Sequence, residues 1–358
     1  MTRSATPWDA TCFRAAVQSA LDAFVDEQSA ALRPLGEDAA RLVDAARSSV
    51  SGGKRLRAAF CFWGYRAVEA EPTDEPALTR AAAALELLHA SALVHDDYLD
   101  SSATRRGRPA THKAFEAMHR EQVWSGDPEQ YGAAAAILLG DLLLCWSDEL
   151  LRRCGLPHDA VRNALELFDT SRTEVITGQF LDVSVQARGS GDVAQAMRVL
   201  RYKSAKYSVE RPLHVGAALA GSGRDTLEAL SGFGLPLGEA FQLRDDLLGV
   251  YGDPEVTGKP AGDDLTEGKR TVLVALALQQ APAEDARRLD EALGSQLSAT
   301  EVADLRRVIE DSGAHAEVER RIHELTSTAL GALDAAPVTD LAREVLRELA
   351  AAATQRAV

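Results

Sequence analysis

The sequence is poor in several residue types, and each scarcity narrows the class of protein. Aromatic residues make up 5% of the chain, and there are 13 prolines and 4 cysteines among 358 residues. Few aromatic residues beside abundant alanine and leucine disfavour a β-sandwich and favour helices. The cysteines show no CxxC spacing, which argues against a zinc site or a disulfide framework; they are Cys12, Cys61, Cys145 and Cys154. The composition predicts an all-α protein whose thiols are idle in a reducing compartment.

Positive charge is also scarce. The chain has 39 Lys and Arg against 54 Asp and Glu, which gives a net charge of −15. Such a surface repels nucleic acids and anionic lipids, so we expect no nucleic-acid partner. The hydrophobic share of 46% and the charged share of 26% are typical of a globular chain and not of a disordered one.

Long hydrophobic runs are missing as well. The first residues show no apolar segment behind a basic one, so the start reads as an ordinary N-terminus without a signal peptide. The most apolar run, Ala133 to Trp146, is interrupted by Asp141 and is shorter than the roughly 20 residues that a membrane span requires. We therefore expect a cytoplasmic protein without a transmembrane segment.

Apolar residues recur at helical spacing through almost the whole chain. Turn-forming residues interrupt this pattern at Ser51 to Gly53, Ser101 to Pro109, Trp124 to Gly132, Ala187 to Asp192, Gly221 to Arg224, Gly252 to Lys269 and Ala335 to Val338. None of these breaks is a long linker, and no repeat of fixed period appears. Although length alone suggests about two domains, the pattern predicts a single domain over residues 1–358, folded as a helical bundle.

Two acidic clusters stand at the ends of helical ladders. Leu88, Ala92, Asp96 and Asp100 follow one another at intervals of four residues, so one face of one helix carries an apolar floor and two carboxylates. Like charges at this spacing repel each other unless a cation lies between them.

The same arrangement recurs later in the chain, where Leu237, Phe241 and Asp245 form a ladder with Asp246 beside its end. An isolated Asp pair is usually a solvated helix end, but two matched ladders are better explained by a bound cation. Carboxylate oxygens suit Mg²⁺, which completes its octahedron with water and substrate phosphates. The clusters therefore predict a diphosphate substrate.

Small basic sets accompany these clusters in an otherwise acidic chain. Each set alone is most simply a solvated surface, but together with the acidic clusters they predict contacts to diphosphate oxygens that no metal reaches. The sets are Lys54, Arg55 and Arg57; Arg105 and Arg106; Lys203 and Lys206; and Lys259 and Lys269.

At this point the chain resembles the trans-isoprenyl diphosphate synthases, or polyprenyl synthetases, and among them bacterial geranylgeranyl diphosphate synthases. The resemblance covers residues 51–271, where six motifs follow in order: GGKRLR, HDDYLDSSATRRGRP, GQFLD, KSAK, FQLRDDLLG and GKPAGDDLTEGKRT. Outside that core the match is limited to helical character.

The resemblance implies an all-α isoprenoid synthase fold with a central active-site cavity. It also implies a homodimer and a Mg²⁺ cofactor, with three ions around the allylic diphosphate. The allylic diphosphate (dimethylallyl, geranyl or farnesyl) would ionise and be attacked by the double bond of isopentenyl diphosphate, with release of diphosphate. The product would be geranylgeranyl diphosphate or a longer all-trans polyprenyl diphosphate.

Roles carry over from the family motifs by position. The metal ligands would be Asp96, Asp100 and Asp245, with Asp97 and Asp246 as supporting carboxylates. The allylic diphosphate would be held by Arg105, Lys203, Gln242 and Lys259, with Lys269 nearby as the pocket closes, and Ser204 would also bind substrate. The diphosphate of isopentenyl diphosphate would be held by Lys54, Arg57, His89 and Arg106. Gln179 and Asp182 would lie on a third helix facing the site.

The chain departs from the family pattern at Gly249, where a third Asp is common, so the third ligand of the second motif is in doubt. Asp253 lies just before Pro254, beyond the expected helix end, and is not assigned as its replacement. The glycine-rich segment Gly252 to Lys269 is a candidate lid that closes over substrate.

The resemblance also bears on product length. Ser91 and Ala92 precede Asp96 by five and four residues, at the level where a bulky aromatic residue closes the tunnel of farnesyl-length family members. Both residues are small here, so we expect a product longer than farnesyl diphosphate. The floor would come from Leu88 or from the helix that carries Leu142, Leu143 and Trp146.

Two other functions remain open from the sequence. A class I terpene cyclase shares the fold and the metal-triggered ionisation, but it has no use for a second diphosphate site. A non-catalytic partner subunit of a prenyl synthase would be expected to have lost acidic ligands, and here the first motif is complete. Fold alone does not distinguish these classes of protein, so the residues of the site must distinguish them.

Overall fold

The computed structural model of the protein describes residues 8–189, 192–252 and 262–355. Almost all of the described chain is helical, and its strands are β1 (Thr104–Arg105) and β2 (Arg108–Pro109), which pair as a two-residue antiparallel ribbon. The prediction of an all-α fold is confirmed. The chain divides into two compact units, each built from segments that are distant in sequence, and the single-domain organisation stays a prediction.

The first unit comprises Met1–Leu167, Pro212–Gly223 and Val338–Leu346. Its helices are α1 (Ala10–Leu32), the short 3₁₀ turn η1 (Arg33–Leu35), α2 (Glu37–Ser49), α3 (Leu56–Val68), α4 (Glu75–Leu99), α5 (Thr111–Glu121), α6 (Pro128–Arg152) and α9 (Arg211–Leu219, from Pro212 on), with the beginnings of α7 (His158–Arg188) and α17 (Asp340–Thr354).

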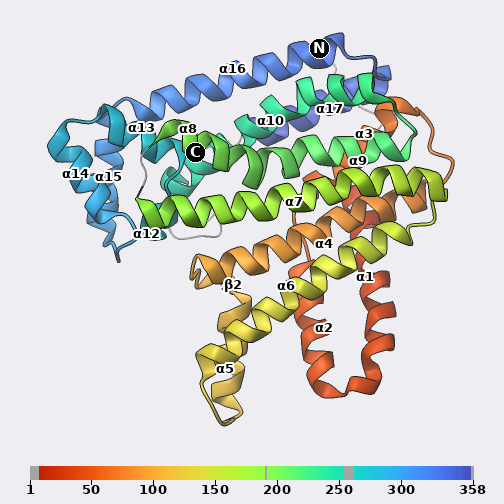
Figure 1. Ribbon diagram of the computed structural model, residues 1–358, viewed down its shortest axis with the longest axis horizontal. Helices are drawn as coiled ribbons and strands as arrows, with labels where there is room; N and C mark the ends of the chain where they lie inside the picture. The colour runs from red at the N-terminus through yellow and green to blue at the C-terminus, as the bar shows by residue number, and fades with distance from the viewer. Residues whose placement is uncertain (1–7, 190–191, 253–261, 356–358) are drawn as a thin grey trace. The chain divides into compact units, whose positions relative to one another are not determined.

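Helix α4 is the central helix of this unit and packs against α6, α3 and α1 (Figure 1). Asp74 caps its N-terminus by accepting a hydrogen bond from the Ala77 amide at 2.8 Å. It is the one described helix that is long and apolar enough to cross a membrane, but 78% of its most apolar window is buried inside the protein, as in a core helix.

Small residues allow the helices of the first unit to approach closely. A β-carbon on Gly216 of α9 would lie 1.8 Å from the Cys61 carbonyl oxygen of α3, and one on Gly140 of α6 would lie 2.0 Å from the His95 ring of α4. A substitution at Gly216 would therefore force the helices apart, whereas one at Gly140 would displace the His95 ring. Cys61 and Cys154 are buried free thiols, whereas Cys12 and Cys145 are exposed free thiols.

The second unit comprises Phe168–Arg211, Arg224–Pro337 and Arg347–Val358. It contains most of α7, then α8 (Val193–Val199), the π-helix η2 (Leu200–Glu210), α10 (Arg224–Tyr251), α12 (Asp263–Thr266), α13 (Val272–Gln280), α14 (Ala283–Ala292), α15 (Ala299–Asp311), α16 (Ala314–Ala335) and the end of α17.

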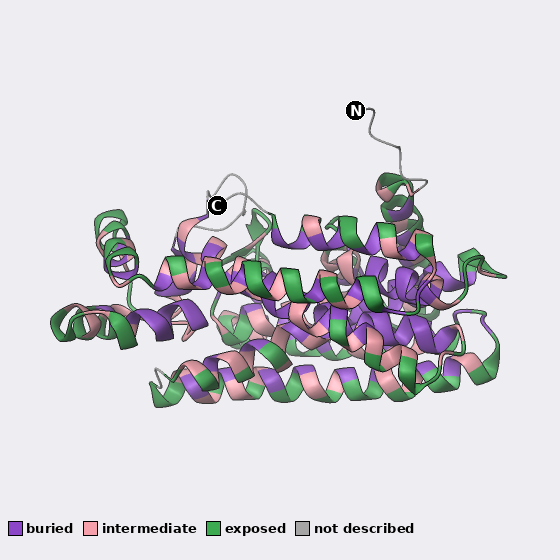
Figure 2. Cartoon of the chain, turned by 90° about the horizontal axis from the view of Figure 1, so that it is seen from above, coloured by how far each residue is buried: buried purple, intermediate pink, exposed green. Residues whose placement is uncertain are grey.

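Helix α10 is the centre of the second unit and packs against α16 and η2. Leucine, isoleucine and valine side chains from α10, α13 and α15 form its core, among them Leu243, Leu247, Leu273 and Ile309. Along the helices buried and exposed residues alternate (Figure 2), as expected for amphipathic helices that turn one face to a core.

Most of the predicted chain breaks lie between helices. The break predicted at Trp124 to Gly132 is wrong in its second half, because α6 already begins at Pro128, which suits a first helical turn, with Asp127 as its cap. Ser101 to Pro109 holds the short ribbon, which the helical pattern did not predict. Of the candidate lid, residues 253–261, including Asp253 and Lys259, lie outside the described residues.

Candidate active site

The first acidic ladder lies at the end of α4. Asp96 is half-buried in the last turn, and Asp100 is the C-cap residue whose amide donates to the Asp96 carbonyl at 2.8 Å. Asp97 is only 3% exposed and accepts a hydrogen bond from Arg105 Nε at 2.7 Å. Arg105, assigned by resemblance to the allylic diphosphate, is therefore paired with a carboxylate of the same motif.

The two-residue ribbon sets the position of the neighbouring arginine. Arg106 and Gly107 form its turn with φ of 52° and 72°, the pair of positive values that a tight hairpin turn requires. From this turn Arg106 Nη1 donates to the Ser51 carbonyl at 3.1 Å, and the guanidinium lies against Gly53. The hairpin thereby meets the glycine loop that precedes Lys54.

His89 lies two turns before Asp96 on the same helix. The pKa of His89 is held well below its usual value because burial disfavours the charged ring and because Arg57, Arg106 and Arg105 repel it. The ring is therefore neutral at pH 7. Three of the four residues predicted to hold the second diphosphate, His89, Arg57 and Arg106, are thus near enough to interact electrostatically.

Arg55 does not belong with these diphosphate candidates, although the sequence placed it in the same basic set. It is 5% exposed and pairs with Glu86 at 3.2 Å, while its Nη2 donates to Gln18 Oε1 at 2.5 Å. Gln18 also accepts from the Gly52 amide at 3.2 Å. These contacts fix the loop before Lys54, so Arg55 has a structural role.

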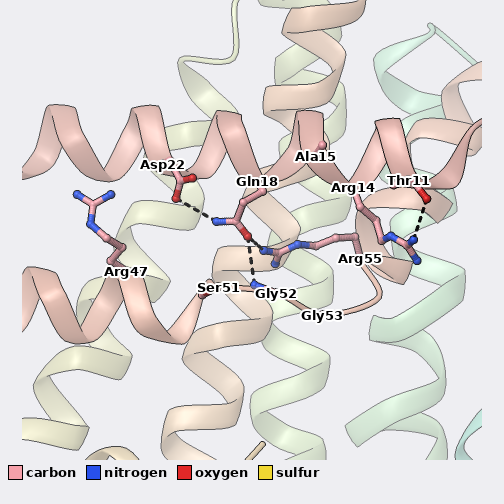
Figure 3. A pocket seen from close by; sticks show the side chains of 10 residues that line it. All are labelled: Thr11, Arg14, Ala15, Gln18, Asp22, Arg47, Ser51, Gly52, Gly53 and Arg55. Carbon is pink, nitrogen blue, oxygen red and sulfur yellow. Dashed lines mark hydrogen bonds between the residues drawn. The ribbon is translucent and has the colours of Figure 1, made fainter.

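A cavity of about 550 Å³ lies behind that loop, between α1 and the residues that follow α2. Figure 3 shows Gln18 between Asp22 and Arg55 on its wall, with Arg14 and Arg47 on either side. Arg55 lines this cavity, but none of the described residues that the family resemblance assigns to a diphosphate does. A second cavity, of about 500 Å³, is lined by Asp97, Arg105 and Arg106.

The π-helix η2 carries the KSAK motif of the second unit. Lys203 Nζ donates to Asp182 of α7 at 2.6 Å, and Lys206 Nζ donates to Glu174 of the same helix at 2.7 Å. Glycines bring the neighbouring helices close, since β-carbons on Gly178 and Gly238 would each lie 2.4 Å from the backbone of η2. Asp182 is thus the partner of Lys203, whereas Glu174 is a residue that the sequence did not single out.

The second acidic cluster lies on α10. Asp246 is 5% exposed and accepts a hydrogen bond from Gln242 Nε2 at 2.8 Å. Burial raises the pKa of Asp246 to about 8 against the effect of that hydrogen bond, and the nearby carboxylates of Asp264 and Asp245 add to the rise. Asp245 is half-buried one residue earlier.

Gly249 lies one helical turn after Asp245, and its environment explains why it is glycine. A β-carbon there would lie 1.9 Å from Oδ2 of Asp264, a buried residue of α12. Lys269 lies beside this carboxylate, with Nζ 3.7 Å from Asp264 Oδ1 and 2.6 Å from Glu267 Oε2. The carboxylate of Asp264 therefore occupies the space that a side chain at position 249 would require.

Contacts outside the predicted motifs also hold this cluster. Arg244, directly before Asp245, forms a bidentate ion pair with Glu319 of α16 at 2.5 and 2.7 Å and donates to the Thr354 carbonyl at 3.0 Å. The spacing of Arg244 and Glu319 along the chain gave no signal for this pair.

An all-α fold that carries acidic clusters beside lysine and arginine defines a class of helical enzymes acting on diphosphate esters. A model of one such family, polyprenyl synthetase, matches residues 39–311, which include the motif-bearing core. The chain belongs to the polyprenyl synthetase family and is a prenyl transferase.

Relatives and solved structures agree with this assignment. The chain is 32% identical to a geranylfarnesyl diphosphate synthase of Aeropyrum pernix over 84% of this chain and 88% of that protein. It is 37% identical to a geranylgeranyl diphosphate synthase of Mycobacterium tuberculosis over 66% of this chain and 61% of that protein. The crystal structure of geranylgeranyl pyrophosphate synthase from Corynebacterium glutamicum, complexed with isoprenyl diphosphate and magnesium, covers 98% of this chain and 100% of that one, with a TM-score of 0.95 and 41% identity.

The donor set fits the magnesium ion that the family implies. Within residues 8–189, 192–252 and 262–355 no three His, Cys, Asp or Glu side chains are grouped closely enough to hold a metal by themselves. Mg²⁺ in phosphate-processing sites takes only one or two carboxylates from the protein and fills its sphere with water and substrate phosphates. Half-buried Asp96, Asp100 and Asp245 are oxygen donors of this kind.

Proposed function

We propose that this protein condenses isopentenyl diphosphate with an allylic prenyl diphosphate to give geranylgeranyl diphosphate or a longer all-trans polyprenyl diphosphate, with release of diphosphate. The observation that carries the proposal is that cationic side chains accompany both acidic clusters. Arg105 pairs with Asp97, and Lys269 pairs with Asp264, which packs against Gly249 of α10 beside the second cluster. Support comes from the 41% identity to a synthase whose structure contains isoprenyl diphosphate and magnesium.

In this proposal Asp96, Asp100 and Asp245 are the Mg²⁺ ligands, and the number of ions is three. When bound, Mg²⁺ withdraws electron density from the leaving diphosphate, so that the allylic C–O bond can ionise. Asp97 and Asp246 support the ligands: Asp97 holds Arg105, and Asp246 holds Gln242.

The cationic residues then divide between two diphosphates. The allylic diphosphate is held by Arg105, Lys203, Gln242 and Lys259, with Lys269 nearby as the pocket closes. The positive charges of the arginine and the lysines stabilise the leaving group. Ser204 also binds substrate in this proposal. Lys54, Arg57, His89 and Arg106 hold isopentenyl diphosphate. The neutral ring of His89 offers a hydrogen bond without adding charge.

The double bond of isopentenyl diphosphate attacks the allylic carbocation, and the proton that is then lost goes to the released diphosphate. Closure of the segment Gly252 to Lys269 would exclude water, which would otherwise capture the cation.

The expected product length rests on small residues of α4. Ser91 is buried and donates to the Gly140 carbonyl of α6 at 2.7 Å, while Ala92 is half-buried. Neither residue blocks a growing prenyl chain with an aromatic ring. The names of the relatives include farnesyl, geranylgeranyl and geranylfarnesyl diphosphate synthases, so the length must be measured.

We propose that the protein is a cytoplasmic homodimer, and exposed apolar side chains support the dimer. Helix α6 exposes Ile137 and Leu138 by 44% and 60%. Helix α7 exposes Ile176, Phe180 and Val183 by 56%, 68% and 38%, which lie on one face at helical spacing. Surfaces of this kind are covered in oligomers, and a second copy of the chain is the occupant that we propose.

Incubation with Mg²⁺, labelled isopentenyl diphosphate and dimethylallyl, geranyl or farnesyl diphosphate in separate reactions tests this function. Chromatography of the dephosphorylated products should show geranylgeraniol or a longer prenol. Farnesol as the only end product would contradict the predicted length. A hydrocarbon formed from the allylic substrate alone would show a terpene cyclase, and absence of any product would favour a partner subunit.

A further inference from the structure

The π-helix η2 is held by an ionic clamp that the proposed reaction does not use directly. Glu174 of α7 accepts hydrogen bonds from Lys206 Nζ at 2.7 Å and from Arg211 Nε and Nη2 at 2.7 and 2.8 Å. The three side chains are mostly buried, with exposed fractions of 15%, 14% and 14%. One carboxylate thus binds two cations that stand five residues apart.

This spacing matters because it distinguishes a π-helix from an α-helix. In an α-helix of 3.6 residues per turn, residues five apart lie about 140° apart around the axis and cannot converge on one carboxylate. A π-helix has hydrogen bonds between residues five apart, so such residues stack on one face. The Arg211 amide donates to the Lys206 carbonyl, which is a bond of this type between the two clamped residues.

Further contacts fix the same segment along its length. Arg201 donates to Glu239 of α10 at 2.6 Å, and Glu210 accepts a hydrogen bond from Ser231 Oγ at 2.8 Å. Gly178, one turn after Glu174 on α7, lets the backbone at Lys203 approach so closely that a β-carbon would lie 2.4 Å from the Lys203 amide nitrogen. Glu174 and Gly178 therefore act on the same stretch of η2 from the same face of α7.

The two cations of the clamp stabilise the ionised form of Glu174. Burial alone would raise the pKa of Glu174, but the hydrogen bonds from Arg211 and Lys206 outweigh it and hold that pKa below its usual value. The carboxylate is therefore ionised at pH 7. Removing its charge would leave two buried cations without their strongest partner.

We propose that Glu174 is a positioning residue that selects the π-helical winding of residues 200–210 and so directs Lys203 toward the allylic diphosphate. Relaxation of η2 to α-helical winding would change the rotation of every residue within it and turn Lys203 away from Asp182. The inference rests on the proposed function for the ligand of Lys203. Its structural half, the control of winding by Glu174, is independent of that function.

Glu174→Gln tests the proposal, because it keeps the size of the side chain and removes its charge. We expect the KM for the allylic diphosphate to rise roughly tenfold to a hundredfold, as for a displaced substrate-positioning group, with the KM for isopentenyl diphosphate changed less than twofold. Hydrogen–deuterium exchange should quicken in peptides covering 200–211 and stay unchanged in α16. Glu174→Asp should restore part of the loss.

Asp169→Asn is the matched control, since Asp169 is an exposed carboxylate on the same helix that pairs with Arg172 outside the clamp. It should change neither KM nor exchange. Lys206→Met removes one of the two cations of the clamp and should likewise raise the KM for the allylic diphosphate but not that for isopentenyl diphosphate. It replaces Glu174→Gln as the test if that variant does not fold.

The binding of inorganic diphosphate in the presence of Mg²⁺ gives a readout that does not require turnover. Weaker binding with faster exchange in 200–211 would support the proposal. Equal rises in both KM values, or a lower kcat with unchanged exchange, would overturn it. If the wild-type protein forms no product, the proposed function fails, whereas unchanged exchange and unchanged diphosphate binding in both variants defeat the role of Glu174.

Discussion

His89 illustrates how position sets the chemistry of a single residue. From the sequence it was a candidate ligand for isopentenyl diphosphate. The structure places it near Arg57 and Arg106, and burial and these charges lower its pKa. Below about pH 6.5 this histidine is protonated in the unfolded chain but stays neutral in the folded protein, because its folded-state pKa is lowered. The free energy of unfolding therefore decreases as the pH falls.

Replacement of His89 by glutamine should remove this pH dependence. At pH 7.5 the histidine is neutral in both the folded and the unfolded protein, so its protonation does not affect stability. Between pH 7.5 and 5.5 the wild-type protein should lose up to about 1.4 kcal/mol relative to His89→Gln. Urea unfolding of both proteins at pH 7.5 and 5.5 measures the difference, and an identical difference at the two pH values would refute the lowered pKa.

Gly249 is a residue that sequence reasoning recognised as a departure but could not explain. Its physical reason is a contact between segments that are 15 positions apart, which no local pattern reveals: the carboxylate of Asp264 lies where the β-carbon would be. Gly249→Asp should lose roughly 1 to 3 kcal/mol of stability through overpacking, with repulsion between two carboxylates in addition.

The double variant Gly249→Asp with Asp264→Ala should recover part of that loss, with a coupling of about 1 kcal/mol or more, because the substitutions share one space. Gly331→Asp is the control, since Gly331 is a helical glycine of α16 with nothing within 4 Å of its β-carbon position. Thermal unfolding of Gly249→Asp, Asp264→Ala, the double variant and Gly331→Asp provides the measurement, and additive effects would show that Asp264 does not fill the space.

Among the elements, helices of strong apolar periodicity were predictable and local irregularities were not. Helix α4 was recognised from the ladder of Leu88, Ala92 and Asp96, and its burial follows from that composition. The stretch KSAK reads as ordinary helix, because its π-helical winding depends on Glu174, which lies on another helix. The ribbon at Thr104–Pro109 was hidden inside an expected loop, since two-residue strands leave no alternation to detect.

The face of α4 also yields a prediction for product length. Ala92→Phe places a ring one turn before Asp96, so the growing prenyl chain should stop earlier and the main product should shift to farnesyl diphosphate or a shorter one. Ser91 hydrogen bonds to α6, so the substitution at position 92 is the cleaner test. Chromatography of the dephosphorylated products reads the length, and an unchanged distribution would show that Ala92 does not line the chain's path.

For the molecule as a whole, motif order was more informative than length. Six motifs in register predicted the all-α isoprenoid synthase fold, which the structure and the family match confirm. Length suggested two domains and the linker pattern one, while the structure has two compact units whose segments interleave along the chain. This interleaving arises from packing between segments that are distant in sequence, and local sequence patterns do not predict such contacts.

The candidate site was predictable as a set of residue types, but the pairing of its members was not. The sequence grouped Arg55 with Lys54 and Arg57 in one basic set, although Arg55 is buried against Glu86. It named Gln242 and Asp246 separately, although they share a hydrogen bond. Such pairings depend on the rotation of each helix about its axis, which a spacing rule fixes only within one helix.

The central claim is that the two acidic clusters drive a Mg²⁺-dependent condensation. The most direct measurement is the rate at which labelled isopentenyl diphosphate is incorporated by the wild-type protein, by Asp96→Ala and by Asp245→Ala, with Asp311→Asn, an exposed carboxylate of α15, as the control. We predict that the kcat of Asp96→Ala and of Asp245→Ala falls roughly a hundredfold to ten-thousandfold, because each substitution removes several kcal/mol of leaving-group stabilisation. Chelation of Mg²⁺ should abolish incorporation. The control should match the wild type. Full activity in either aspartate variant, or incorporation without a divalent cation, would contradict the account.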